Sequence, residues 1–277
     1  MRPSWIRSSI VTLVAALLLP GLSGPALAAP DGTLTWGVHV TLAARWLDPS
    51  DTEAFITPFM VLYAIHDALV KPMPAGDNTP SLAESWTQSK DGLTYEFALR
   101  KGVKFHNGDP VTATDVKFSF DRYKGAAAKL LKDKVREVQI VGPGRVRFHL
   151  KEPWPDFMTF YGTSASGAAW IVPKTYVEKV GDDGFKKAPV GAGPYKVVSF
   201  NPGVDLVMEA FDGYWRKVPS VKRAGVPQLA RRDDARRCAQ GGRRGHRVPP
   251  ERADGRGGQA DAGAAARRCQ ASWRRVP

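Results

Sequence analysis

Apolar residues recur along the chain with two different periods, which predict a mixture of strands and helices. Residues 93–99 alternate strictly between apolar and polar positions, and residues 33–40 follow a similar pattern; this is the signature of a half-buried strand. Residues 59–70 instead space their apolar side chains as one face of a helix does. A threonine at position 112 with an aspartate three residues later resembles a capping box and predicts a short helix over residues 112–123.

Two turns rich in glycine and proline predict hairpins. The turn at residues 142–144 predicts a hairpin over residues 135–150, and the turn at residues 201–203 predicts one over residues 195–210. Strands and helices do not alternate in a regular βαβ repeat. The sequence therefore predicts a mixed α/β (α+β) fold for the body of the chain.

The N-terminus has the pattern of an export signal. Two arginines precede the apolar run of residues 10–19, which is about half as long as a bilayer span, and a small-x-small motif follows at residues 26–28. A buried N-terminal helix is the weaker alternative, because the run shows no polar face. We expect a signal peptide at residues 1–28, cleaved between Ala28 and Ala29, and a periplasmic product.

Charge is distributed unevenly along the 277 residues. The chain holds 40 Lys and Arg against 27 Asp and Glu, a formal net charge of +13, but residues 222–277 alone hold 15 basic and 5 acidic residues. Fourteen of those 15 are arginines, and Trp273 is the only aromatic residue among them. The basic character thus belongs to a tail at residues 222–277, while residues 29–221 form a nearly balanced body.

Three interpretations of the tail stay open. Its Arg, Gly, Ala and Pro are encoded by GC-rich codons, so out-of-frame translation after about residue 222 is the favoured one. A solvated disordered tail is the second. A nucleic-acid or anionic-surface binder is the third, although aromatic residues for base stacking are not interleaved. Both cysteines, Cys238 and Cys269, fall in the tail, and whether they form a disulfide stays open; a cysteine-free body suits an oxidising compartment.

Catalytic and metal-binding motifs are not found in the body. Its histidines are not spaced as metal ligands, and residues 164–167 lack the first glycine of a nucleophile elbow. Residues 191–194 begin like a dinucleotide fingerprint, but Pro194 makes them a rigid turn into a strand. We therefore expect no enzyme activity, no cofactor and no metal site.

A series of motifs with turn glycines at fixed places carries a resemblance. It consists of residues 80–86, 91–97, 99–113, 115–120 and 189–195, followed by Tyr214 and Trp215. In order and spacing the series resembles extracellular solute-binding protein family 5, the dipeptide-, oligopeptide- and nickel-binding components of bacterial ABC importers. The resemblance covers roughly residues 33–221, about the first half of a typical member.

The resemblance implies a two-lobed fold like that of class II periplasmic binding proteins, which closes on a solute by hinge motion and docks on a membrane permease. Here residues 29–221 correspond mostly to the first lobe and the start of the crossover. The implied partners are a small solute (a peptide, opine, sugar or chelated nickel) and the ABC permease; we expect a monomer and no nucleic acid. Since the second lobe is not recognisable, we expect weak binding or none by this chain.

Two other classes of function stay open: a single-lobe interaction or sensor module, and a binder of anionic surfaces that acts through the arginine-rich tail. For a solute site, the candidate residues are Trp36, Arg45, Trp46 and Trp170. Aromatic faces and a guanidinium suit a peptide backbone, a carboxylate or a chelated cation. The competing interpretation of each is a core or rim position. We expect three other tryptophans in the core: Trp86, Trp154 and Trp215.

Overall fold

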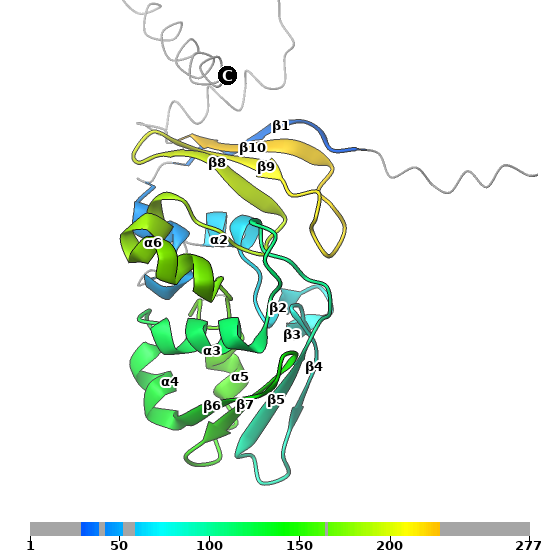
Figure 1. Cartoon of the computed structure of the whole chain (residues 1–277), viewed down its shortest axis with the longest axis vertical. Helices are drawn as coiled ribbons and strands as arrows, with labels where there is room; N and C mark the ends of the chain where they lie inside the picture. The colour runs from blue at the N-terminus through cyan, green and yellow to red at the C-terminus, as the bar shows by residue number, and fades with distance from the viewer. Residues whose placement is uncertain (1–28, 39–41, 52–58, 164–165, 228–277) are drawn as a thin grey trace, which may run out of the picture.

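The computed structural model describes residues 29–38, 42–51, 59–163 and 166–227. Two four-stranded sheets lie at the top and the bottom of the molecule as drawn in Figure 1, with the helices between them. The fold is mixed α/β, as the sequence predicts. The expected signal peptide, both cysteines and most of the arginine-rich tail lie outside the described residues.

The upper sheet joins the two ends of the described chain. Its strands, in spatial order, are β1 (Asp31–Thr35), β10 (Val221–Pro227), β9 (Asp205–Ala210) and β8 (Tyr195–Asn201). The first two strands pair in parallel, and the others pair antiparallel. The hairpin predicted around residues 201–203 is confirmed as β8 and β9.

Strand β10 crosses the boundary expected between body and tail. Residues 222–227 show no strand periodicity in the sequence, yet they pair with β9 on one side and with β1 on the other. A strand with a partner on each side is held by backbone hydrogen bonds in both directions, so it depends less on an alternating side-chain pattern. Residues 222–227 therefore belong to the folded body, and the strand prediction missed them.

The lower sheet is entirely antiparallel. Its strands, in spatial order, are β4 (Ala83–Gln88), β5 (Thr94–Leu99), β7 (Arg145–Leu150) and β6 (Val135–Gly142). A separate two-stranded ribbon consists of β2 (Val70–Met73) and β3 (Gly76–Pro80). The predicted strand at residues 93–99 is confirmed as β5, and the predicted hairpin around residues 142–144 is confirmed as β6 and β7.

The helices fill the space between the sheets. They are η1 (Ala44–Leu47), η2 (Pro49–Asp51), α2 (Phe59–Ile65), α3 (Ala113–Arg122), α4 (Ala128–Lys134), α5 (Phe157–Tyr161) and α6 (Lys174–Lys187), the last kinked at Gly181. Helix α3 begins at the predicted capping box, where the Asp115 carboxylate accepts the backbone N–H of Thr112 at 2.9 Å.

Two predicted elements are shorter than their sequence patterns. The helix predicted over residues 59–70 ends at Ile65, and the chain enters β2 at Val70. The carbonyl of Ile65 accepts the backbone N–H of Gly193 at 2.9 Å, so a distant segment terminates the helix. The strand predicted over residues 33–40 ends at Thr35. For the helix, a tertiary contact overrides the local apolar pattern, whereas beyond β1 single backbone hydrogen bonds to Gly225 and Pro227 continue from Trp36 and Val38.

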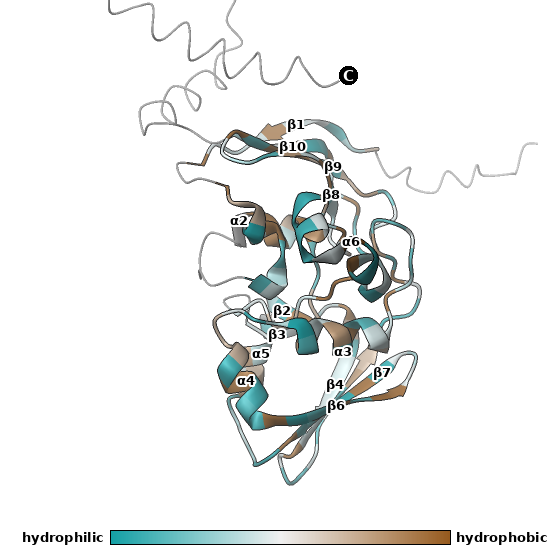
Figure 2. Ribbon diagram, turned by 60° about the vertical axis from the view of Figure 1, so that its left-hand side comes forward, coloured by the Kyte–Doolittle hydropathy of each residue, from teal (hydrophilic) through white to brown (hydrophobic). Residues whose placement is uncertain are grey.

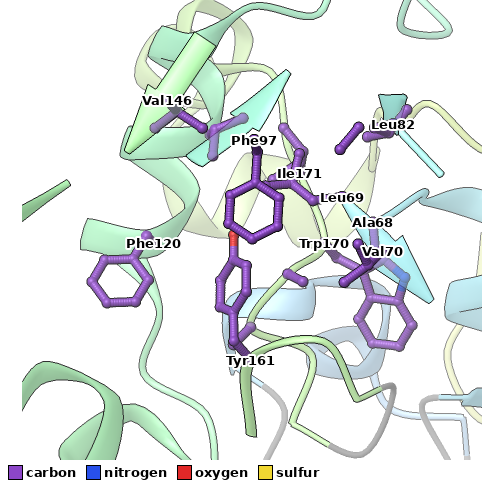
Figure 3. Close-up of a cluster of buried hydrophobic side chains, with 14 of the residues drawn as sticks. Ala68, Leu69, Val70, Leu82, Phe97, Phe120, Val146, Tyr161, Trp170 and Ile171 are labelled. Carbon is purple, nitrogen blue, oxygen red and sulfur yellow. The ribbon is translucent and has the colours of Figure 1, made fainter. Parts of the chain in front are cut away.

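The lower core is the larger of two hydrophobic cores and is dominated by aromatic rings. Phe148 is fully buried, and its ring centroid lies 4.8 Å from that of Tyr161 and 5.4 Å from that of Phe120. The rings of Phe97 and Tyr161 also face each other in this cluster (Figure 3). Trp86, Trp154 and Trp215 are half-buried and pack against it, in agreement with the sequence prediction.

The upper core lies between the upper sheet and the α2 and η1 helices. Val61 and Ile65 of α2 pack there with Leu206 and Met208 of β9. Figure 2 shows brown, hydrophobic stretches on the strands and on the helices that lie against them. The upper core has fewer members than the lower core, and the two meet along α2, whose Leu62 belongs to the lower one.

A glycine-rich segment, residues 191–194, lies close to the end of α2. A Cβ atom added at Gly191 would lie 2.0 Å from the carbonyl oxygen of Ile65, so no larger residue fits without movement. On the other side of the segment, the imidazole of His106 lies 3.0 Å from the carbonyl oxygen of Gly193 and accepts the backbone N–H of Gly191 at 3.2 Å. The family-like motifs at residues 99–113 and 189–195 therefore bind each other.

Candidate functional site

A shallow hollow opens beside α2 and β2. Its lining residues are Tyr63, Ala68, Val70, Lys71, Gly162, Thr163, Gly167, Ala169 and Trp170. It encloses almost no volume of its own, because its empty space of about 170 Å³ includes open solvent. Pockets that enclose a small molecule usually have about 300–1,000 Å³. The described residues thus offer at most one side of a binding site here.

Backbone pairing between two distant segments builds the hollow. The backbone N–H of Leu69 binds the carbonyl of Ala169 at 3.0 Å, and Ala68 forms an isolated bridge with Trp170. Gly162 lets the chain turn close to the ribbon, because a Cβ atom there would meet the side chains of Asn78 and Val70 at 2.6 and 2.8 Å. Backbone pairing therefore holds the segment between α5 and α6 against the start of β2 and forms this surface.

An aromatic pair forms one wall of the hollow. The rings of Tyr63 and Trp170 meet edge to face, with centroids 5.6 Å apart. Trp170 is only 3% exposed and also belongs to the lower core, as its position among apolar side chains shows (Figure 3). The ammonium of Lys71 lies 5.8 Å from the Tyr63 ring centroid. The wall therefore combines apolar faces with a single positive group.

A buried carboxylate lies behind Lys71. Asp67 is fully buried and accepts four donors: the Lys71 ammonium, the Ser81 hydroxyl at 3.1 Å, the Tyr214 hydroxyl at 3.0 Å and the Trp215 indole N–H at 2.9 Å. Burial, together with this negative charge, raises the pKa of Tyr214 well above its usual value. Because buried charges are tolerated only when paired and hydrogen-bonded, Asp67 locks these segments together.

Arg45 and Trp46 lie on the η1 turn, on the side of α2 that faces the upper core. Arg45 is exposed, whereas Trp46 is half-buried and packs against the upper core. Asp48 ends this turn, with its backbone N–H bound to the Arg45 carbonyl at 3.2 Å. The turn thus presents one cation at the surface beside a partly covered aromatic ring.

Trp36 follows β1 at the edge of the upper sheet. Its backbone N–H binds the carbonyl of Gly225 at 2.8 Å, while its side chain is 54% exposed. Leu34, two residues earlier on the same strand, is 53% exposed. The two side chains form an apolar strip at the surface.

The structure separates the four residues that the sequence singles out. Trp170 lines the hollow, Arg45 and Trp46 occupy the η1 turn, and Trp36 lies on the sheet edge. Sequence reasoning missed Tyr63 and Lys71 as lining residues. Tyr63 carried only the signal of an apolar helix position, and a lone lysine carries no pattern. Only the pairing of Ala68 with Trp170 brings them together.

Neither a cluster of metal ligands nor a long apolar helix occurs among the described residues. Within them, no three or more His, Cys, Asp or Glu side chains gather in a way that could hold a metal ion. Over the same part of the chain, helices long and apolar enough to cross a membrane are not found.

Residues 78–242 match the family model described as bacterial extracellular solute-binding proteins, family 5, middle region. The match begins in β3 and extends past the boundary that the sequence suggested at residue 222. It includes the lower sheet, most of the hollow's lining and the Tyr214–Trp215 pair.

Among curated proteins, the chain is similar to the glutathione-binding protein GsiB of Salmonella choleraesuis, with 34% identity over 212 residues. That alignment covers 74% of this chain and 38% of the relative. The GsiB of Escherichia coli is 32% identical over 230 residues, covering 80% of this chain and 41% of the relative. The chain thus spans about two fifths of the length of these relatives.

Solved structures show the same likeness. The binding protein MoaA of A. tumefaciens, in complex with mannopinic acid, superposes with a TM-score of 0.67 at 29% identity, over 76% of this chain and 44% of MoaA. NikZ of Campylobacter jejuni, in complex with Ni(L-His), gives a TM-score of 0.66 at 26% identity, over 77% of this chain and 42% of NikZ. These neighbours are two-lobed periplasmic binding proteins, so the predicted fold class is confirmed.

Proposed function

The chain belongs to the bacterial extracellular solute-binding proteins of family 5, and on this premise we propose that it supplies the solute-capturing surface of an ABC importer. The match over residues 78–242 carries the proposal. The similar proteins are named as solute-binding proteins, among them a glutathione-binding protein and an ABC transporter substrate-binding protein. We accordingly propose that this chain captures its solute without transforming it.

The proposed capture surface has two parts. The η1 turn contributes the exposed Arg45 and the half-buried Trp46, and the hollow contributes Tyr63 beside Trp170, which is only 3% exposed. The Lys71 ammonium is already paired with Asp67, so Arg45 is the exposed cation that suits a solute carboxylate, and aromatic faces pack against peptide planes. We therefore favour a small peptide-like acid as solute. Glutathione is the first probe to test, because the similar curated proteins are glutathione-binding proteins.

The affinity of this surface alone should be low. The hollow encloses almost no volume and is open to solvent, so a bound solute would keep much of its hydration. Binding also has to overcome the loss of translational and rotational freedom. We propose millimolar dissociation constants for the 277-residue chain, and tight capture only where a second lobe closes over the solute.

Export and docking complete the proposal. We propose that residues 1–28 direct the chain to the periplasm and are cleaved after Ala28, and that the monomeric product delivers its solute to the permease. Mass spectrometry of protein purified from the periplasm would test the cleavage, because a mature N-terminus at Ala29 is expected. A chain that retains Met1 in the cytoplasm would contradict the export.

NMR spectroscopy of the indole N–H groups tests solute capture at millimolar affinity. The assigned signals of Trp46 and Trp170 are followed while glutathione, a dipeptide or the Ni(L-His) complex is added. We expect saturable shifts of these two signals with one of the solutes, and a constant signal for Trp86. Replacement of Trp170 by Phe should weaken the response at Trp46, whereas the matched Trp86→Phe variant should leave it unchanged.

The same titration can overturn the proposal. If none of the three solutes moves the Trp46 or Trp170 signal at millimolar concentration, the proposed surface does not capture solutes of this class. If Trp86 responds as strongly as Trp170, binding takes place elsewhere or is non-specific.

A further inference from the structure

A buried guanidinium is one of the groups that attach the η1 turn, which carries Arg45 and Trp46, to the rest of the molecule. Arg122, at the end of α3, is 8% exposed in its side chain and faces the fully buried carboxylate of Asp48. Its two terminal nitrogens bind the two oxygens of Asp48 at 2.8 and 2.5 Å. This is the bidentate geometry that only a planar guanidinium offers.

The same guanidinium binds a second carboxylate. Its Nε and one terminal nitrogen donate to Asp182 of α6 at 3.0 and 2.9 Å. The Cζ atom of Arg122 lies 5.4 Å from the Phe185 ring centroid. Asp182 differs from Asp48 in exposure, since its side chain is 46% exposed. Arg122 therefore joins one buried and one solvated carboxylate from opposite ends of the described chain.

Asp48 shapes the turn that it ends. One oxygen of its carboxylate accepts the backbone N–H of Ser50 at 2.9 Å, and its own backbone N–H binds the Arg45 carbonyl at 3.2 Å. If Arg122 were removed, the Asp48 carboxylate would be a buried charge without its main partner. Such a group has to move toward water, which would pull the turn with it.

Contacts around the guanidinium act on the same short segment. The carbonyl of Ser50 accepts the backbone N–H of Lys124 at 2.8 Å, and Asp51 pairs with Lys186 at 2.6 Å. On the other side of the turn, the carbonyl of Leu47 lies 3.0 Å from the ring nitrogen Nε2 of His66. The segment is thus held against α3, α6 and the end of α2, with the Arg122–Asp48 pair as the buried centre.

We propose that Arg122 is a positioning residue for solute capture, which acts through Asp48 to hold Arg45 and Trp46 in place without touching the solute. This inference rests on the proposed function, because it assigns the turn a role in binding. In this proposal the two carboxylates have different roles. Asp48 sets the position of the turn, and Asp182 only completes the guanidinium's hydrogen bonds.

Two variants separate positioning from general support of the fold. Arg122→Lys keeps the positive charge but cannot bind both oxygens of Asp48 and reach Asp182. Asp182→Asn keeps the Arg122–Asp48 pair and weakens only the solvated contact. Both variants remove contacts of the Arg122 guanidinium. Their free energies of unfolding should therefore be compared first, by urea denaturation. The Lys129→Met variant, at a side chain that is 90% exposed and outside this network, serves as the surface control.

The readouts are the Trp46 indole signal of the free protein, amide hydrogen exchange over residues 47–51, and the dissociation constant for glutathione. In Arg122→Lys we expect a shifted or broadened Trp46 signal, faster exchange and a dissociation constant raised about tenfold, equivalent to about 1.4 kcal/mol. Asp182→Asn and Lys129→Met should change that constant by less than about twofold.

Different outcomes overturn different statements. If Arg122→Lys leaves exchange and affinity unchanged, or if affinity falls equally in Arg122→Lys and Asp182→Asn in step with lost stability, Arg122 is not a positioning residue. If the wild-type chain binds none of the three solutes, the proposed function fails and the role in capture fails with it. The exchange measurement alone then decides whether Arg122 holds the turn.

Discussion

The two sheets of this molecule differ in how much of their surface is buried. In the lower sheet, the central strands β5 and β7 alternate between buried and less buried residues, and their inner face packs on an aromatic core beneath α3, α4 and α5. In the upper sheet, all five residues of β1 are exposed, and a smaller core lies between β9 and α2. The lower sheet is thus covered on its inner face, although its edge strands β4 and β6 are mostly exposed. The upper sheet has an uncovered edge with Leu34 and Trp36 on it.

The difference indicates where stability resides. Burial of apolar area is the main source of folding free energy, so the lower core should contribute most of it. Of the candidate residues, Trp36 and Arg45 are exposed, whereas Trp170 is buried in the lower core. The chain spans about two fifths of the length of its curated relatives.

The largest effect is expected from truncation at the centre of the lower core. Phe148→Ala removes a fully buried ring that contacts Phe97, Phe120 and Tyr161. Because the lost ring leaves a cavity, we expect the free energy of unfolding to fall by about 3–5 kcal/mol. Urea denaturation followed by circular dichroism measures this. A loss below about 1 kcal/mol would show that the lower core is not the main source of stability.

Acidification should loosen the junction between the two sheets. Burial lowers the pKa of His66 and that of His106 to about 4. Histidine in the unfolded chain titrates near pH 6.5, so the unfolded state takes up protons first and is favoured as the pH falls. The loss should begin near pH 6.5, end near pH 4 and amount to roughly 3 kcal/mol for each histidine.

Urea midpoints at pH 7, 5.5 and 4.5 measure this dependence. The His149→Gln variant, changed at a histidine that is not buried, should follow the wild-type curve, whereas His106→Gln should flatten it. A stability that stays constant between pH 6.5 and 4.5 would contradict the buried neutral state of these imidazoles.

An added methyl group tests the close approach of the two halves directly. In Gly191→Ala the new Cβ would lie 2.0 Å from the Ile65 carbonyl oxygen, so α2 and the glycine-rich segment must separate. We expect a loss of about 1–3 kcal/mol in the free energy of unfolding. Gly144→Ala is the matched control, because no atom lies within 4 Å of its added Cβ. Equal stability of the two variants would contradict the close packing.

The smallest effect is expected at the uncovered edge. Trp36→Ala removes a side chain that is 54% exposed while its backbone hydrogen bond to Gly225 can persist. We expect the free energy of unfolding to change by less than about 0.5 kcal/mol. A loss comparable to that of Phe148→Ala in the same urea assay would show that the upper sheet supports the fold as much as the lower one.

How far sequence reasoning reached differs between elements. The strand over residues 93–99, both hairpins and the capping box at Thr112 were predictable, because each depends on side chains close together in the chain. The end of α2 at Ile65, the pairing of residues 222–227 and the surroundings of Lys71 were not. Each of these depends on a partner far away in sequence: Gly193 for the helix end, β9 and β1 for the last strand, and Asp67 with the segment around Trp170 for the hollow.

The sequence by itself determined the mixed α/β class, the likeness to family 5 and the absence of catalytic and metal-binding motifs from the body, since local periodicity and spaced motifs are written along the chain. Only the tertiary structure decided which chemical groups meet. Trp170 contacts Tyr63, Arg122 pairs with Asp48, and Asp67 accepts four hydrogen-bond donors. These groups meet because sheet pairing and helix packing bring distant segments together. Contacts of this kind leave no periodic trace in a single sequence.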